Sequence, residues 1–190
     1  YDAQVLWDSD LIASSRNGVT SGVMGNCGVG CAPLDPAIRS DLISLLEGVE
    51  DIPRESIEAA LDWRWHSFAS YLEAVEARPH TINLAANATH APLRMIAMGA
   101  RAFDGSEPRE DDIAKMCALL EEALGSGAVA FSTDRVALHQ MGDGRHVPDF
   151  AAPRREVLAL AKVVAERSGR PIQFASDFGM VGTEADTLRE

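Results

Sequence analysis

Short apolar runs alternate with amphipathic helical patterns along this chain, and the alternation restricts the possible folds more than any other feature. The apolar runs are too brief for helices and are bounded by turn residues, which is typical of buried strands. We expect strands in GVTSGVMGN, HTINLAANATH, GAVAFSTD and RPIQFASDFG. We expect helices over 36–47, 67–78, 109–127 and 154–167, with Gly125 at the end of the third and with Gly48 and Gly169 as the stops of the first and last. This alternation predicts an α/β protein with a parallel sheet.

Polar side chains gather where the predicted strands end. In a parallel sheet, the groups that carry out chemistry collect at this carboxyl-terminal edge. The residues that follow or end the strands are Asn26, Cys27, Asn87, His90, Ser132, Thr133, Asp134, Arg135, Ser176 and Asp177. The segment 136–153 is too long and too polar for a tight connection, so we expect it to run over the mouth of the sheet.

The charge balance argues against two classes of partner. With 17 basic and 29 acidic residues the net charge is −12, which repels nucleic acids and anionic membrane surfaces. No apolar run approaches the roughly 18–20 residues of a membrane span, and no secretory leader opens the sequence. Three cysteines are too few for a disulfide framework, so we expect reduced thiols. We predict one soluble, cytoplasmic domain, and the opening Tyr without a cap or turn before it indicates a piece of a longer chain.

The glycine-rich stretch VMGNCGVGCAP holds Cys27 and Cys31. A thiolate at the end of a buried strand, between glycines that allow close approach of a ligand, could bind a borderline-soft ion such as Zn²⁺. The alternative is a buried and inert thiol, which is the commoner fate of a free cysteine. A single C-x3-C pair is weak evidence for zinc, and Cys117 belongs to a predicted helix core.

Each of the other candidate site residues has a functional and a structural interpretation. His90 follows a strand and precedes a proline, so its imidazole is expected either to face a ligand or to cap a helix. Arg94, one turn later, suits an anion. Asp134 and Arg135 suit either substrate orientation or a structural ion pair, and Asp177 suits a metal ligand, a general base or a helix cap. We expect the remaining histidines to be solvated: His66, His80, His139 and His146.

Five blocks follow one another along the chain: GVTSGVMGNCGVGCAP, LLEGVEDIP, LDWRWHSFASYLEAVEARP, THAPLRMIAMG and GAVAFSTDRVALHQMGDGRHVPDF. Taken together they resemble the N-acyl-D-amino-acid deacylases (D-aminoacylases) of the amidohydrolase superfamily. The resemblance implies a metal-dependent (β/α)8 barrel, of which residues 1–190 form a partial barrel domain of early βα units. It also implies that the family's His-x-His strand precedes Tyr1, and that the second half of the barrel follows Glu190.

The resemblance assigns roles to individual residues. Cys27 matches the family's metal-binding cysteine, which implies a zinc ion held in part by this thiolate. His90 and Arg94 fall in a block similar to the family's His-x-x-Leu-Arg pattern, near the mouth of the active site. We expect them to bind the substrate together with Asp134 and Arg135. The general base, an aspartate, is expected beyond the last residue of this chain.

The chain departs from the family pattern at residues 173–177, QFASD, where D-aminoacylases place a metal-binding histidine. Either Asp177 replaces that histidine as an oxygen ligand, or this branch of the family builds its metal site differently and acts on another amide. The predicted metal ligands within the chain are therefore Cys27 and Asp177.

The leading hypothesis for function is hydrolysis of a non-peptide C–N bond, namely the amide of an N-acyl-D-amino acid. The partner is then a small-molecule N-acyl amino acid, with no role for nucleic acid or a membrane. A cyclic amide is the alternative substrate class. A further alternative is a non-catalytic fragment or binding module that self-associates, because half a barrel exposes strand edges and apolar faces.

Overall fold

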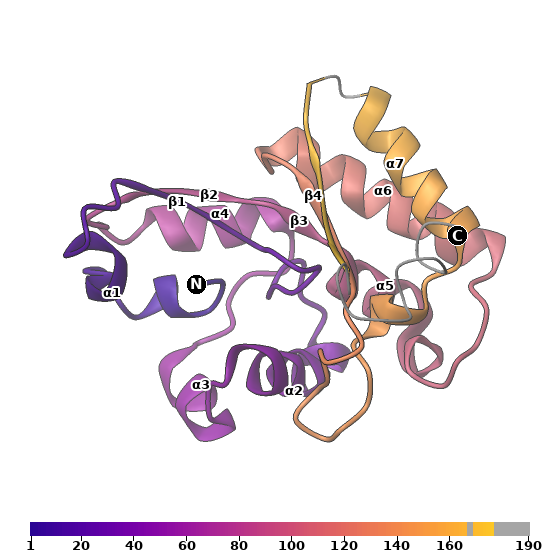
Figure 1. Cartoon of the computed structure of the whole chain (residues 1–190), viewed down its shortest axis with the longest axis horizontal. Helices are drawn as coiled ribbons and strands as arrows, with labels where there is room; N and C mark the ends of the chain where they lie inside the picture. Colours follow the sequence, from indigo (N-terminus) through magenta and orange to yellow (C-terminus); the bar gives the residue numbers. More distant parts are fainter. Residues whose placement is uncertain (167–168, 177–190) are drawn as a thin grey trace.

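The computed structural model describes residues 1–166 and 169–176, and its strands form two parallel sheets (Figure 1). The strands are β1 (Ser21–Met24), β2 (Asn83–Ala86), β3 (Ala88–Thr89), β4 (Phe131–Arg135) and β5 (Ile172–Ser176). β1 pairs with β2, and β4 lies between β3 and β5. Only Asn87 separates β2 from β3, so the chain passes directly from one sheet into the other. All the pairings are parallel, which confirms the predicted α/β class.

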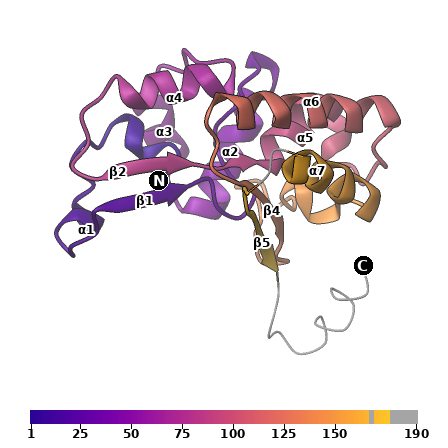
Figure 2. The same cartoon turned by 90° about the horizontal axis from the view of Figure 1, so that it is seen from above.

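One short helix precedes β1, and the others lie between strands along the chain. The helices are α1 (Ile12–Ser15), α2 (Arg39–Glu50), α3 (Arg54–Ala60), α4 (Phe68–Glu76), α5 (His90–Met98), α6 (Glu110–Ser126) and α7 (Arg154–Glu166). Short 3-10 turns cover Gln4–Leu6, Pro36–Ile38, Gly99–Ala102 and Pro148–Ala151. Figure 2 shows α4 beside β1 and β2 at one end of the molecule, and α5 to α7 together on one side of β4 and β5 toward the other.

Successive side chains of β4 point to opposite faces of the strand, and the two faces contact different parts of the protein. Phe131 and Thr133 both contact His90 of α5, so they lie on the face that the helices cover. Ser132 and Asp134 alternate with them and therefore lie on the opposite face. Ser132 there contacts the turn that follows β1.

The predicted apolar stripe of α6 is part of the core. Met116, Leu120 and Leu124 are fully buried, and Ile113 is nearly so. Cys117 packs against the core from a half-buried position. The helix runs past the predicted end at Gly125 and is capped by Gly127, whose φ of 122° suits glycine.

Gly48 does not end a helix, contrary to the prediction. α2 continues through Gly48 to Glu50, and Asp51 takes the left-handed cap conformation with a φ of 58°. The glycine is required by packing instead: a Cβ at Gly48 would lie 2.1 Å from the carbonyl oxygen of Gln140. The segment after β4 thus runs directly over this turn of α2, where the Gly142 amide donates to the Ser44 carbonyl at 2.7 Å.

The prediction that the strands are buried holds for β4 and is wrong for β1 and β5. Val23 of β1 is 54% exposed, and Ile172 and Phe174 of β5 are 42% and 39% exposed. No helix or strand among the described residues covers these side chains, so these apolar groups stay partly exposed to solvent. Within the same residues, no helix is both long enough and apolar enough to cross a membrane.

Candidate functional site

The turn after β1 holds Cys27 in an unusual backbone conformation. Gly25, Cys27 and Gly28 have φ values of 80°, 55° and 68°. Glycine adopts such values freely, but a residue with a Cβ is strained there by about 1–3 kcal/mol. Strain of this kind persists only where the surroundings enforce it, and it is concentrated at functional sites. The conformation therefore singles out Cys27 from the other free cysteines, Cys31 and Cys117.

Side chains from β4 and β5 enforce this conformation. The Ser132 hydroxyl donates to the carbonyl of Gly25 at 2.5 Å and accepts from the amide of Gly28 at 3.0 Å. The Oε1 atom of Gln173 accepts from the amide of Cys27 itself at 2.9 Å. Distant parts of the sequence thus meet at the carboxyl-terminal edge of the sheet, as predicted from the positions of the polar residues.

Gly28 is the closest point between this turn and the segment after β4. A Cβ at Gly28 would lie 2.1 Å from Oδ2 of Asp149, which is fully buried. The same oxygen accepts from the amide of Asp134 at 2.8 Å, so it is not free to move away. Only glycine satisfies both the positive φ and this approach.

We therefore expect Gly28→Ala to lower the free energy of unfolding by about 2–4 kcal/mol, from backbone strain and overpacking together. Gly105→Ala is the matched control, because Gly105 has a φ of 78° and nothing within 4 Å of its Cβ position. The control should lose only about 1 kcal/mol. Urea unfolding followed by circular dichroism measures both losses, and equal losses would show that the contact with Asp149 does not matter.

The Cys27 thiol lies in the negative electrostatic field of several carboxylates. Its pKa is raised by burial first and then by the negative charges of Asp134, Glu50 and Asp149. The thiol form is therefore favoured in the protein alone. A cation beside the sulfur would offset both effects and favour the thiolate. This acidic environment suits a bound cation better than a nucleophilic thiolate.

Asp134 and His139 form a pair at the end of β4. Oδ2 of Asp134 accepts from Nδ1 of His139 at 2.9 Å, and Oδ1 accepts from the Val136 amide at 3.1 Å. Burial raises the pKa of the Asp134 carboxyl, and the nearby His139 opposes that shift. His139 was expected to be solvated; instead it is oriented by a buried carboxylate, and its side chain is only 27% exposed. A histidine so soon after the acidic strand end was the sequence signal for this pair.

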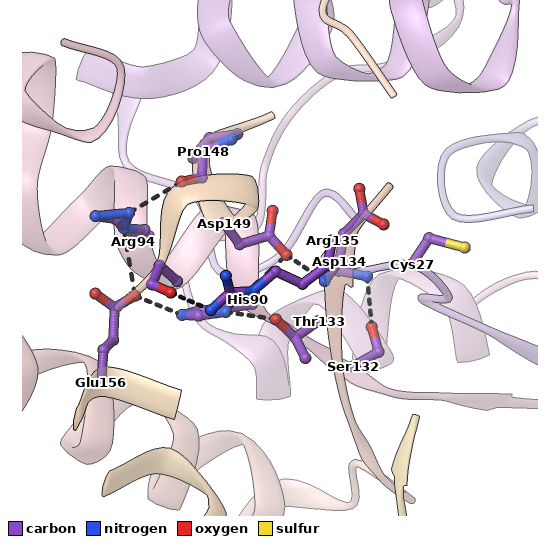
Figure 3. Close-up of polar contacts among 12 residues, drawn as sticks. Cys27, His90, Arg94, Ser132, Thr133, Asp134, Arg135, Pro148, Asp149 and Glu156 are labelled. Carbon is purple, nitrogen blue, oxygen red and sulfur yellow. Dashed lines mark hydrogen bonds and ion pairs between the residues drawn. The ribbon is translucent and has the colours of Figure 1, made fainter. Parts of the chain in front are cut away.

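His90 lies inside the protein (Figure 3). Its Nδ1 atom is 2.8 Å from Oγ1 of Thr133, and its Nε2 atom is 2.8 Å from Oε1 of Glu156. Both ring nitrogens are therefore engaged. The imidazole joins α5 to β4 and α7, and its position favours a structural role over the predicted contact with a substrate.

Arg94 is buried beside His90. Its Nη1 atom donates to the carbonyl of Pro148 at 2.9 Å, and its Nε atom lies 3.3 Å from Oε1 of Glu156. Arg94 is 2% exposed, so the guanidinium compensates a buried carboxylate and does not face a site that an anion could enter from solvent. Arg135, the fourth predicted substrate contact, donates to the Ala152 carbonyl from the end of β4.

Two buried acids of this region were missed from the sequence. Asp149 is fully buried, and burial raises its pKa to about 6 against the opposing charge of His90. Glu156 is fully buried as well. It lies at helical spacing from the apolar residues Leu160 and Val164, and an acid on an apolar stripe was the signal that could have identified it.

A family model described as "Amidohydrolase family" matches residues 1–188, almost the whole chain. The chain belongs to the amidohydrolase family. The chain is 37% identical over 185 residues to an uncharacterized protein of Mycobacterium tuberculosis (strain ATCC 25618 / H37Rv); the match covers 93% of the chain and 30% of that protein. The chain is also 32% identical over 132 residues to the D-aminoacylase of Alcaligenes xylosoxydans xylosoxydans. This match covers 70% of the chain and 24% of the enzyme.

Solved structures extend this likeness to the fold. The chain matches a D-aminoacylase crystal structure with a TM-score of 0.70 and 26% identity, over 99% of the chain and 34% of that enzyme. It also matches an N-acyl-D-glutamate deacylase of Bordetella bronchiseptica that is complexed with zinc and a phosphonate inhibitor. The TM-score is 0.65 and the identity 30%, over 90% of the chain and 31% of that enzyme. The expected amidohydrolase fold is confirmed. The chain spans about a third or less of the relatives it matches.

Cys27 fits a metal ion by donor type, since a thiolate suits zinc and related ions. Across residues 1–166 and 169–176, no group of three or more His, Cys, Asp or Glu side chains is arranged to hold a metal ion. The described part of the chain thus offers one strong donor and no complete ligand set. The other predicted ligand, Asp177, lies outside the described residues.

Proposed function

We propose that the gene product containing this chain is a metal-dependent amidohydrolase that cleaves the amide of an N-acyl-D-amino acid. The observation that carries the proposal is the strained, tightly held Cys27 at the carboxyl-terminal edge of the sheet, in an acidic environment that suits a cation. The relatives support the substrate class: one is a D-aminoacylase and another is an N-acyl-D-aspartate deacylase, the latter 27% identical over 168 residues.

We propose zinc as the ion, with Cys27 among its ligands. Zinc was bound to the N-acyl-D-glutamate deacylase, and a D-aminoacylase that matches with a TM-score of 0.67 and 29% identity has a binuclear metal centre. When bound, such an ion lowers the pKa of water and polarises a carbonyl group. Asp177 stays a predicted ligand, and the general base expected beyond Glu190 stays a prediction as well.

This chain's own residues would orient the substrate next to Cys27. Asp134 holds the proton on Nδ1 of His139, which leaves Nε2 as an acceptor for a substrate or leaving-group N–H. Arg135, the next residue of the strand, donates to the Ala152 carbonyl, so its predicted contact with a substrate carboxylate stays a prediction. We therefore propose that substrate binds beside the end of β4, and we do not extend this role to the buried His90 and Arg94.

Hydrolysis of paired substrates by the full-length gene product tests this function. We expect release of the free amino acid from N-acetyl-D-methionine or N-acetyl-D-glutamate, with little from the L forms. Dialysis against a chelator should abolish the activity, and added Zn²⁺ should restore it. Cleavage of dihydrouracil instead of these amides would favour the cyclic-amide alternative. No hydrolysis by the zinc-loaded protein would support the non-catalytic one and overturn the proposal.

We also propose that the protein is cytoplasmic and that the chain self-associates. Reduced, free thiols at all three cysteines fit the proposed cytoplasmic location. Self-association would bury the exposed apolar side chains of β1 and β5, Val23 and Phe174 among them. Neither statement bears on the proposed reaction.

A further inference from the structure

Ser132 spans the turn that carries Cys27. Its fully buried hydroxyl contacts the residues on both sides of the cysteine, as donor to the Gly25 carbonyl and as acceptor from the Gly28 amide. Figure 3 shows the contact with the turn, close to the Cys27 side chain. One hydroxyl group thus links the Gly25 carbonyl to the Gly28 amide, on the two sides of Cys27.

Gln173 holds the cysteine itself. Ser132 and Gln173 are direct partners in the parallel pairing of β4 with β5, so their side chains stand next to each other on one face of the sheet. Ser132 binds the ends of the turn and Gln173 binds the amide of Cys27. The two side chains are a matched pair that supplies three hydrogen bonds to the turn.

This pair opposes the backbone strain at Cys27. Without it, the amides of Cys27 and Gly28 would lose their hydrogen-bond partners, and relaxation of the turn out of the left-handed region would redirect the thiol. A side chain that only stabilised the fold would not need to accept hydrogen bonds from the amides of Cys27 and Gly28 in particular. All three hydrogen bonds are to the backbone of the turn, one at Cys27 and two at the flanking Gly25 and Gly28.

We propose that Ser132 and Gln173 are positioning residues that hold the Cys27 thiol in the orientation required to bind a divalent metal ion. The proposal rests on the proposed role of Cys27 as a ligand. It also explains why Gln173, within the stretch that departs from the family pattern, is not free to act as a ligand itself: its amide oxygen is committed to the Cys27 backbone. Groups that orient a metal ligand typically contribute about 10- to 100-fold to metal affinity.

Cobalt binding to the full-length gene product tests the proposal independently of catalysis. Titration with Co²⁺ gives the dissociation constant, and the thiolate-to-cobalt charge-transfer absorption reports directly on the sulfur–metal bond. We expect Ser132→Ala and Gln173→Met to weaken cobalt binding about 10- to 100-fold and to reduce this absorption. Gln173→Glu retains an acceptor oxygen and should restore binding to within about threefold of the parent.

Thr133→Val is the matched structural control. Thr133 lies beside Ser132 on β4 but points to the opposite face, where it contacts His90. This variant should lose stability in urea unfolding and still bind cobalt as the parent does. If Ser132→Ala does not fold, the cobalt affinities of Gln173→Met and Gln173→Glu still show whether the side chain at position 173 positions the Cys27 thiol.

Two results separate the possible failures. If Ser132→Ala and Gln173→Met bind cobalt within about threefold of the parent while Cys27→Ser abolishes the absorption, the positioning role is wrong and the ligand role stands. If Cys27→Ser leaves the absorption of the parent unchanged, or the parent shows none, the ligand role fails and the positioning role fails with it.

Discussion

Glu156→Ala is expected to lower the free energy of unfolding by about 3–5 kcal/mol, the usual cost of removing one partner from a buried ion pair. Glu156 is fully buried, and its Oε1 atom lies 2.8 Å from Nε2 of His90 and 3.3 Å from Nε of Arg94. The variant would leave the Arg94 charge buried without its carboxylate and the imidazole without one hydrogen-bond partner. A small side chain would also leave a cavity between α7 and α5.

Urea unfolding at neutral pH measures this loss. Glu166→Ala is the control from the other end of α7, where the carboxylate is 67% exposed and lies 4.0 Å from Nζ of Lys162. Such exposed pairs contribute at most about 1 kcal/mol, so the control should unfold nearly as the parent does. A loss below about 1 kcal/mol for Glu156→Ala would show that the His90–Glu156–Arg94 contacts do not stabilise the fold.

The elements that sequence patterns predicted well are those whose side chains form a periodic stripe. The stripe through Met116, Leu120 and Leu124 placed α6 correctly because one face of that helix is buried along its whole length. The prediction at Gly48 failed because a glycine signals either a helix end or a close approach of another segment. Here the approaching segment lies about 90 positions further along the chain, at Gln140, which no local pattern reveals.

The candidate site was predictable as a location but not as a set of contacts. Parallel strands bring their ends together, and this placed Cys27, Ser132 and Asp134 at one edge. The sequence could not show which side chains point toward that edge and which toward the helices. His90 and Arg94 lie one turn apart on the buried side of α5. The two residues that the sequence predicted to face a ligand therefore form an internal ion cluster with Glu156.

Cys27→Ala is expected to have the largest effect on function: loss of most of the bound metal and a fall of about a thousandfold or more in amide hydrolysis. The thiolate supplies both a strong bond and a negative charge to the ion, and among residues 1–166 and 169–176 no group of three or more His, Cys, Asp or Glu side chains could hold the ion in its place. The fold should survive the change, because the side chain is only half-buried and alanine fills less space than the thiol. Activity and unfolding measured on one preparation separate the two effects.

Metal analysis of the purified full-length gene product, beside Cys27→Ala and a Cys117→Ala control, tests the central claim most directly. Cys117 is also a half-buried free thiol, but it lies on α6 away from the turn. We expect the parent and the Cys117→Ala protein to carry equal amounts of zinc, and the Cys27→Ala protein to have lost most of it. Equal zinc in all three proteins would show that Cys27 is not a metal ligand.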